Sequence, residues 1–266
     1  MFIDCSMGAA GDMLTGALLE LMPDRDEALG MLNAMGIPGI SFEASDSTKC
    51  GVKGTHVTVK YNGTEEVTED AGEDFAAEAQ DIEYAADHGH SHGHSTLEDI
   101  EKIIRGLRLP DSVKTDAAGV YRIIAEAEGV AHGEPAGEVH FHEVGSMDAV
   151  ADAAAVCLLM HEIMPDAVIV SGIHVGVGYV RCAHGVLPVP APATASILAG
   201  LPAYGGEIQG ELCTPTGAAL LKYFGTEFGA DIEELTGDRE DMRCGRGMGR
   251  KDFERPNCVT VYLDTE

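Results

Sequence analysis

A strongly acidic segment divides the chain and limits which residues can share one hydrophobic core. Residues 64–87 contain ten Asp and Glu residues and no Lys or Arg. Such a segment cannot bury enough apolar surface to offset the entropy of ordering it, so we expect a flexible linker there. The chain is then expected to comprise an N-terminal part (residues 1–63), a disordered acidic and His-rich insertion (64–95) and a main α/β part (96–266).

The overall composition excludes several classes of partner. The 266 residues include 17 Lys and Arg against 45 Asp and Glu, a formal net charge of −28, and 45% are apolar. This negative charge repels nucleic acid and anionic lipid. Alternatively, the acidity is only an adaptation that keeps the protein soluble in a salty cytoplasm. The sequence shows no signal peptide or membrane-spanning run, and its seven cysteines include no C-x-x-C pair. We therefore expect a folded cytoplasmic protein with reduced thiols.

Apolar periodicity predicts an α/β fold, a mixed sheet with flanking helices and a small αβ hairpin subdomain near the N-terminus, with α+β as the alternative. The expected N-terminal elements are a strand at residues 2–5, a helix at 13–22, a helix that Asp24 and Glu27 begin and Gly36 ends, and a hairpin over 40–61 turning at 49–51. After the insertion we expect three helices: one capped by Ser95 and Glu98, one from Asp111 to Gly129, and one over 146–163. A buried strand at 167–173 and a helix ending near Leu198 follow. The last expected elements are a strand at 211–214, a helix with Pro215 in its first turn, and a strand at 258–263.

The densest group of potential metal ligands is His-Phe-His-Glu-Val-Gly-Ser-Met-Asp, residues 140–148. In an extended segment, His140 and His142 lie on the same face. A turn after them would let Glu143 and Asp148 converge on the same ion, and imidazole with carboxylate is a usual ligand set for divalent transition metals. Alternatively, the histidines lie at the surface and Asp148 only complements a helix dipole.

A second group of histidines alternates with small residues at the end of the acidic segment. Neutral imidazole favours nickel, copper, zinc and cobalt over calcium and magnesium, so this group predicts a loose store of transition metal. The alternative is a polar linker that binds metal adventitiously. The residues are His88, His90, His92 and His94.

Two glycine-rich turns, residues 6–12 and 214–217, precede predicted helices. Backbone amides at a helix start can hold a phosphate, but neither turn matches a P-loop or dinucleotide fingerprint, so tight packing is an alternative. Asp4 and Asp12 flank the first turn and are candidate metal ligands, although Asp12 alone suits an N-cap. The candidate ligand-binding residues of the two turns are Gly8, Gly11, Thr214, Thr216 and Gly217.

Arg181 and His184 lie in a predicted loop after a buried strand. A guanidinium and an imidazole in such a loop suit recognition of an anionic ligand near a metal. Pairing of Arg181 with a surface acid explains its presence equally well.

Five motifs, at residues 4–13, 140–148, 184–194, 214–218 and 245–249, occur in the order typical of one family. With them, the chain resembles the N-terminal portion of the LarC family of nickel insertion proteins over almost its whole length. The His-rich insertion also lies where that family carries one.

The resemblance implies a nickel chelatase, a cyclometallase of the lyase class. Its reaction inserts nickel into pyridinium-3,5-bisthiocarboxylic acid mononucleotide and forms the nickel-pincer cofactor of lactate racemase and related enzymes. The family couples this reaction to CTP hydrolysis with manganese or magnesium. Its full-length members continue into a CTP-binding domain that is absent here, which implies a truncated product or a separately made partner.

Under this hypothesis, ligand chemistry assigns the roles of the motif residues. His140, His142, Glu143 and Asp148 form the ordered nickel site, and the four histidines of the insertion collect nickel for it. His142, Glu143 and His184 are the candidate catalytic residues, while His184 and Arg181 face the carboxylate or phosphate of the substrate.

Two other functions are compatible with the same residues. A non-catalytic nickel storage or delivery protein would bind the metal through the histidine insertion alone. A metal-dependent hydrolase would require Asp4, Asp12 and Glu143 to converge. A homo-oligomer is compatible with either function.

Overall fold

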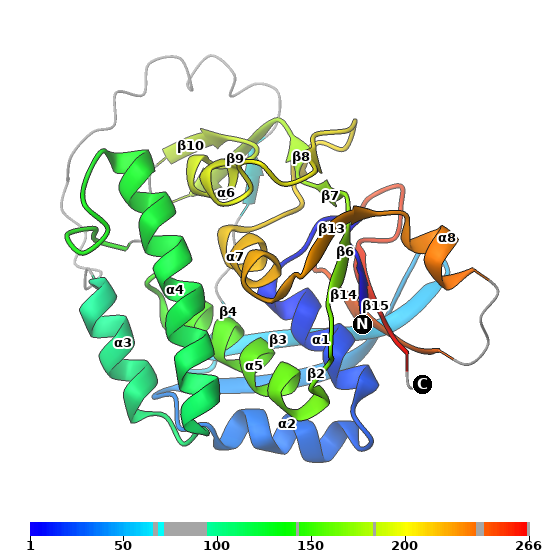
Figure 1. The fold of residues 1–266 in the computed structure, drawn as a ribbon, viewed down its shortest axis with the longest axis horizontal. Helices are drawn as coiled ribbons and strands as arrows, with labels where there is room; N and C mark the ends of the chain where they lie inside the picture. Colours follow the sequence, from blue (N-terminus) through cyan, green and yellow to red (C-terminus); the bar gives the residue numbers. More distant parts are fainter. Residues whose placement is uncertain (66–68, 72–94, 142–143, 183–184, 238–241, 265–266) are drawn as a thin grey trace.

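The largest sheet is mixed and joins strands from both ends of the chain. The computed structural model describes residues 1–65, 69–71, 95–141, 144–182, 185–237 and 242–264 (Figure 1). In spatial order the strands are β13 (Glu227–Ala230), β6 (Ile169–Ser171), β1 (Phe2–Asp4), β15 (Cys258–Leu263), β14 (Arg243–Met248), β3 (Val52–Tyr61) and β2 (Ile40–Lys49), with β4 (Thr64–Glu65) beside β3. Because β1, β6 and β13 run parallel, their carboxyl ends lie at one edge of the sheet.

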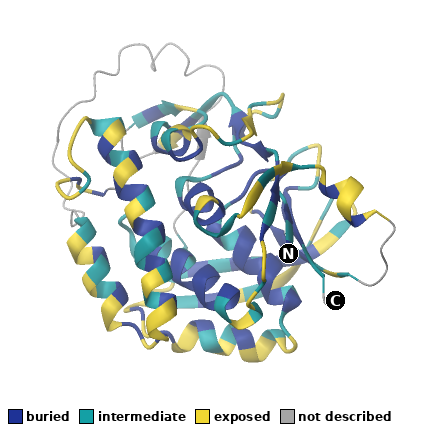
Figure 2. Ribbon diagram, in the orientation of Figure 1, coloured by how far each residue is buried: buried dark blue, intermediate teal, exposed yellow. Residues whose placement is uncertain are grey.

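The helices form successive layers on the sheet. They are α1 (Gly11–Leu21), α2 (Arg25–Ala34), α3 (Leu97–Gly106), α4 (Asp111–His132), α5 (Met147–Ile163), α6 (Pro192–Ile197), α7 (Pro215–Phe224) and α8 (Ile232–Thr236). Helix α1 lies on β14 and β3, α5 packs on α1, and α4 packs on α5 and α7 (Figure 1). Figure 2 shows α5 buried along most of its length, whereas α2, α3 and α4 expose their outer faces.

Short strands build three smaller sheets beside α6. One contains β10 (Gly185–Pro188), β9 (Tyr179–Cys182) and β5 (Glu69–Ala71). The other two pair β11 (Ala203–Tyr204) with β7 (Ile173–His174) and β12 (Gly210–Glu211) with β8 (Gly176–Val177). Figure 1 places them at the top of the molecule, away from the β2–β3 hairpin.

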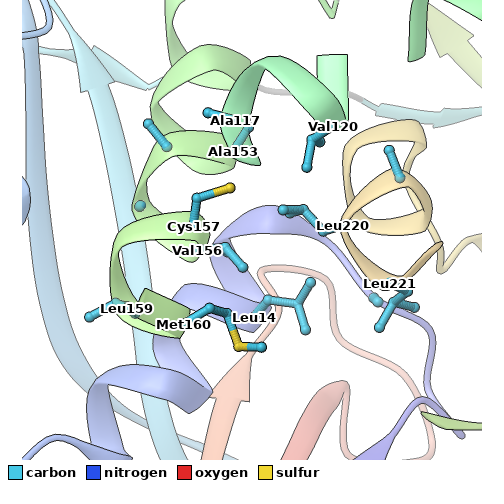
Figure 3. Packing of buried hydrophobic residues seen from close by; sticks show 14 of the residues in the cluster. Leu14, Ala117, Val120, Ala153, Val156, Cys157, Leu159, Met160, Leu220 and Leu221 are labelled. Atoms are coloured by element: carbon cyan, nitrogen blue, oxygen red, sulfur yellow. The ribbon is translucent and has the colours of Figure 1, made fainter. Parts of the chain in front are cut away.

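The core is continuous from the sheet to α4. Figure 3 shows Leu14 of α1, Val156 and Met160 of α5, and Leu220 of α7 packed together, with Val120 of α4 beyond them. Helix α5 has few polar residues because other elements surround it, as expected for a central helix. No helix among the described residues is long and apolar enough to cross a membrane.

Glycines let the backbone of α1 lie almost in contact with the sheet. A Cβ atom added at Gly247 of β14 would lie 1.6 Å from the Met13 carbonyl oxygen, and one at Gly245 would lie 2.1 Å from that of Ala17. A glycine in a strand often marks such a close approach of another backbone. We call this contact of α1 with β14 the α1 seam.

The predicted α/β fold is confirmed, as are most of its elements. The β2–β3 hairpin, β15 and α2 with its Asp24 cap lie where the sequence predicts them. Strand β14 is not predicted from the sequence, because the alternating glycines of this strand resemble a loop.

Two predicted helix ends are displaced. The cap of α3 is Thr96 with Asp99, not Ser95 with Glu98, because the Thr96 hydroxyl accepts from the Asp99 amide and the Asp99 carboxylate accepts from the Thr96 amide. Gly129 does not end α4. That helix continues to His132, and Gly133 adopts the left-handed conformation that ends it.

The α1 seam predicts opposite effects for two Gly→Ala substitutions. Gly247→Ala would push β14 away from α1 and lower the free energy of unfolding by about 1–3 kcal/mol or more. Gly30→Ala in α2, where an added Cβ meets no atom within 4 Å, would raise it by about 0.5–1 kcal/mol. Urea denaturation of both variants measures this; a Gly247→Ala protein as stable as the parent would contradict the seam.

Candidate functional site

The turn after β1 is held by side-chain and backbone hydrogen bonds. The Asp4 carboxylate accepts from the Ser6 amide at 2.8 Å, and the Gly8 amide donates to the Cys5 carbonyl at 2.9 Å. Gly8 has φ +80°, and an added Cβ would lie 2.0 Å from the Leu212 carbonyl oxygen. A side chain is thus excluded at Gly8 by both conformation and packing.

The same turn is joined by backbone hydrogen bonds to the segment before α7. The Ala9 amide donates to Leu212 and the Thr214 amide donates to Ala9, over 3.0 and 3.1 Å. A Cβ atom at Gly217 would lie 2.2 Å from the Ala9 carbonyl oxygen. The starts of α1 and α7 therefore lie side by side, at the carboxyl-end edge of the parallel strands where α/β proteins commonly bind ligands.

Close packing accounts for the glycines of both turns, as the alternative interpretation predicts. The Thr214 hydroxyl caps α7 by accepting from the Gly217 amide at 3.1 Å, and Thr216 is buried. Whether Gly8, Gly11, Thr214, Thr216 and Gly217 also hold a ligand stays a prediction.

His174 is a buried residue of this region that the sequence analysis did not single out. Its Nδ1 lies 3.0 Å from the Ser6 carbonyl oxygen and its Nε2 lies 2.7 Å from that of Gly205. The ring stacks on Tyr204 with centroids 4.7 Å apart. His174 therefore ties the β1 turn to the segment after β11.

The buried cysteines beside this turn are poor nucleophiles. Burial raises the pKa of the Cys5 thiol well above its usual range, and the neighbouring Cys213 and Asp4 raise it further. Burial also raises the pKa of Cys213 to about 12. Both thiols are protonated at neutral pH in the absence of a metal ion, which argues against their acting as thiolate nucleophiles.

Asp12 and Asp148 are two of the predicted metal ligands. Each acts electrostatically on a third carboxyl group, that of Asp152. Asp148 and Asp152 lie one turn apart on α5 and so share a face. The α1 helix meets this face at Gly11, where an added Cβ would lie 2.7 Å from Asp152 Oδ2. The structure thus brings acidic residues of α1 and α5 together.

Two carboxyl groups of this contact, those of Asp12 and Asp152, have raised pKa values. Burial raises the pKa of Asp152 well above its usual range, with Asp12 and Asp148 as additional causes. Burial also raises the pKa of Asp12 and Glu65 adds to that, whereas the Met13 amide and His56 oppose it. Asp152 is not among the residues predicted from the sequence. A second acid one turn after Asp148, in an otherwise apolar helix, could have indicated that it belongs to a site.

The motif at residues 140–148 is anchored by its apolar members. Val139 and Phe141 are buried and His140 between them is exposed. The Tyr121 hydroxyl donates to the Val144 carbonyl at 3.0 Å, from a buried position on α4. Ser146 occupies the N-cap position of α5, as predicted, without a side-chain cap bond.

Several predicted site residues lie outside the described residues, and their roles stay predictions. They are His88, His90, His92, His94, His142, Glu143 and His184.

Both ends of the insertion lie beside predicted site motifs. Ser95, directly after His94, forms an antiparallel bridge with Phe141, and the Phe141 amide donates to the Ser95 carbonyl at 2.9 Å. At the other end, β5 pairs with β9 and places Glu69 opposite the exposed Arg181. The two described parts at the ends of the insertion, Glu69–Ala71 and Ser95, thus lie next to the β9–β10 hairpin and the 140–148 motif, respectively.

The predicted metal ligands that the structure describes do not form one centre. Among the described residues, no three His, Cys, Asp or Glu side chains are arranged to hold a metal ion. Asp4 acts electrostatically on Tyr204, Cys258 and Tyr262, whereas Asp12 acts on Asp152.

Comparisons with known proteins identify the family. The family model described as nickel insertion protein matches residues 1–266. Three relatives are each named pyridinium-3,5-bisthiocarboxylic acid mononucleotide nickel insertion protein. They come from Clostridium kluyveri (37% identical, covering 99% of this chain and 61% of the relative), Desulfitobacterium hafniense (34%, 98% and 57%) and Clostridium acetobutylicum (35%, 100% and 64%).

The chain spans less than two thirds of the length of these relatives. No solved structure matches it. With a family match over its whole length, the chain belongs to the nickel insertion protein family.

Proposed function

We propose that this chain is the nickel-handling part of a chelatase that inserts nickel into pyridinium-3,5-bisthiocarboxylic acid mononucleotide. The names of its relatives support this substrate. The observation that carries the proposal is the bridge between Ser95 and Phe141, because Ser95 directly follows the last histidine of the insertion in the sequence and Phe141 lies within the second histidine motif. Two groups of imidazoles linked in this way suit capture of a metal followed by its transfer.

In this proposal the metal moves from weaker to stronger donors. The histidines of the insertion capture nickel, and His140, His142, Glu143 and Asp148 then hold it near the substrate. Imidazole and carboxylate bind nickel more weakly than the two sulfur atoms and the ring carbon of the product. The nickel–carbon bond forms as the ring carbon loses a proton, for which His142, Glu143 and His184 are the candidate acceptors.

Substrate binding is assigned to the edge where the starts of α1 and α7 lie side by side. We propose that the turns around Gly8, Gly11 and Thr214–Gly217 bind the phosphate of the mononucleotide. Arg181 would bind a carboxylate or phosphate, since a guanidinium forms paired hydrogen bonds with either group.

The remaining steps require the part of the relatives beyond the length of this chain. We propose that a C-terminal domain binds CTP with Mn²⁺ or Mg²⁺ and couples its hydrolysis to insertion, as in the full-length family. The product would serve lactate racemase or a related enzyme.

A non-catalytic nickel store is the second candidate. It is favoured by one observation, that no three metal-binding side chains form a centre within the described ranges. In this alternative the insertion histidines bind all the nickel and the 140–148 motif binds none.

Nickel titration separates these two functions. In protein lacking residues 88–94, His140→Ala together with His142→Ala should weaken nickel binding on the order of 10-fold or more, because two ligands are lost. Isothermal titration calorimetry measures the affinity, and His161→Ala at the far end of α5 is the control. Equal nickel affinity with and without the double substitution would exclude the ordered site and leave the store.

Arg181 tests the substrate site. In a reconstituted reaction with the thiocarboxylated precursor, nickel and CTP, Arg181→Gln should raise the KM for the precursor about tenfold or more, because a charged hydrogen bond is lost. Nickel affinity should not change. The control is Arg122→Gln, which removes an exposed partner of Glu101. An unchanged KM would remove Arg181 from the substrate site.

The same reaction tests the proposed role of a C-terminal domain. Product, detected by its absorbance and mass, should form only when the C-terminal domain of a relative is supplied together with CTP. Formation of product by this chain alone, without CTP, would contradict the proposed coupling.

A further inference from the structure

The contact between α1 and α5 is polar at one point. An added Cβ at Gly11 would lie 2.5 Å from the Asp152 Cβ and 2.7 Å from its Oδ2. The carboxyl group of Asp152 therefore lies against the first turn of α1, the turn that also carries Asp12. One oxygen of Asp12, Oδ1, already accepts from the Met13 amide at 2.8 Å.

Two oxygen atoms, one on α5 and one on α1, are buried without a hydrogen-bond partner. They are Asp152 Oδ1 and Thr15 Oγ1, and Thr15 is 0% exposed. Thr15 follows Gly11 by four residues, so helix geometry puts it on the same side of α1 as Gly11, which meets Asp152. Buried polar atoms in proteins are almost always partnered, so unpartnered oxygens on the facing sides of two helices indicate a ligand.

The local charge indicates what kind of ligand fits. Asp12 and Asp152 repel each other, and Asp148 and Glu65 add further negative potential. His56 acts on Asp12 in the opposite direction and favours its ionised form. Two half-buried carboxyl groups of like charge, one of them with a buried and unpartnered oxygen, favour a cation over a water molecule.

We propose that Asp12, Asp152 and Thr15 bind a hard divalent cation of the Mg²⁺ or Mn²⁺ type. All three supply oxygen, which such cations prefer, whereas nickel favours imidazole. One or two carboxylates with waters or substrate oxygens are the usual protein environment of Mg²⁺, and a Thr hydroxyl is an established ligand for it. The proposed site contains no histidine and does not depend on nickel insertion, although it adjoins Asp148 at the end of the 140–148 motif.

Binding of Mn²⁺ to the full chain, measured by electron paramagnetic resonance at physiological salt, tests the proposal. Asp152→Asn keeps the shape of the side chain and removes its charge, and it should weaken the tightest Mn²⁺ site on the order of 10-fold or more. Asp26→Asn, an exposed acid on α2, should leave that site unchanged. Equal binding in the parent and Asp152→Asn would overturn the proposal.

Thermal unfolding gives a second readout that does not confuse binding with folding. Mg²⁺ should raise the Tm of the parent and not that of Asp152→Asn, whereas without divalent cations the variant should be at least as stable, because a like-charge contact is gone. Thr15→Val, nearly the same shape, should also reduce the Mg²⁺ effect. An absent Mg²⁺ effect on the Tm of the parent would reject a hard-cation site.

Discussion

The near contact between the backbones of α1 and β14 is the constraint on which the arrangement of the site depends. The position of α1 on the sheet is tightly fixed, because there is no room for a methyl group between Gly247 and the Met13 carbonyl oxygen. With α1 fixed on the sheet, its first turn must meet α5 at Gly11, and the turn before it must meet Leu212 at Gly8. Interiors this dense transmit position from one contact to the next.

Tight packing of the helices therefore brings together residues that are distant in the sequence. Asp12 and Asp152 belong to helices that begin on opposite sides of the acidic insertion, and the α1–α5 contact brings their carboxyl groups together. The pair is unfavourable by itself, because burial and like charge both oppose ionisation. An arrangement that costs stability and is held by such tight packing is more typical of a functional site than of a structural one.

The sequence predicts local elements well where one periodicity dominates. The β2–β3 hairpin, α2 and β15 follow from alternating residues, capping chemistry and β-branched runs. It fails at β14, because alternating glycines resemble a loop until the partner that needs them, α1, is known. Gly129 and Gly133 show the same limit, because either glycine could end a helix by sequence. The structure shows that Gly129 lies inside α4 and is a glycine for packing, since an added Cβ would lie 2.6 Å from the Glu134 carbonyl oxygen.

The site was partly predictable for a similar reason. Asp12 and Asp148 stand out by their positions in first turns, while Asp152 becomes visible only when α1 is placed against α5. Separation of the donors by type then follows: oxygen atoms gather at the α1–α5 contact, and histidines gather on the insertion and the 140–148 motif. Under the proposed function, a hard cation held by oxygen at the α1–α5 contact would not compete for the imidazoles that bind nickel.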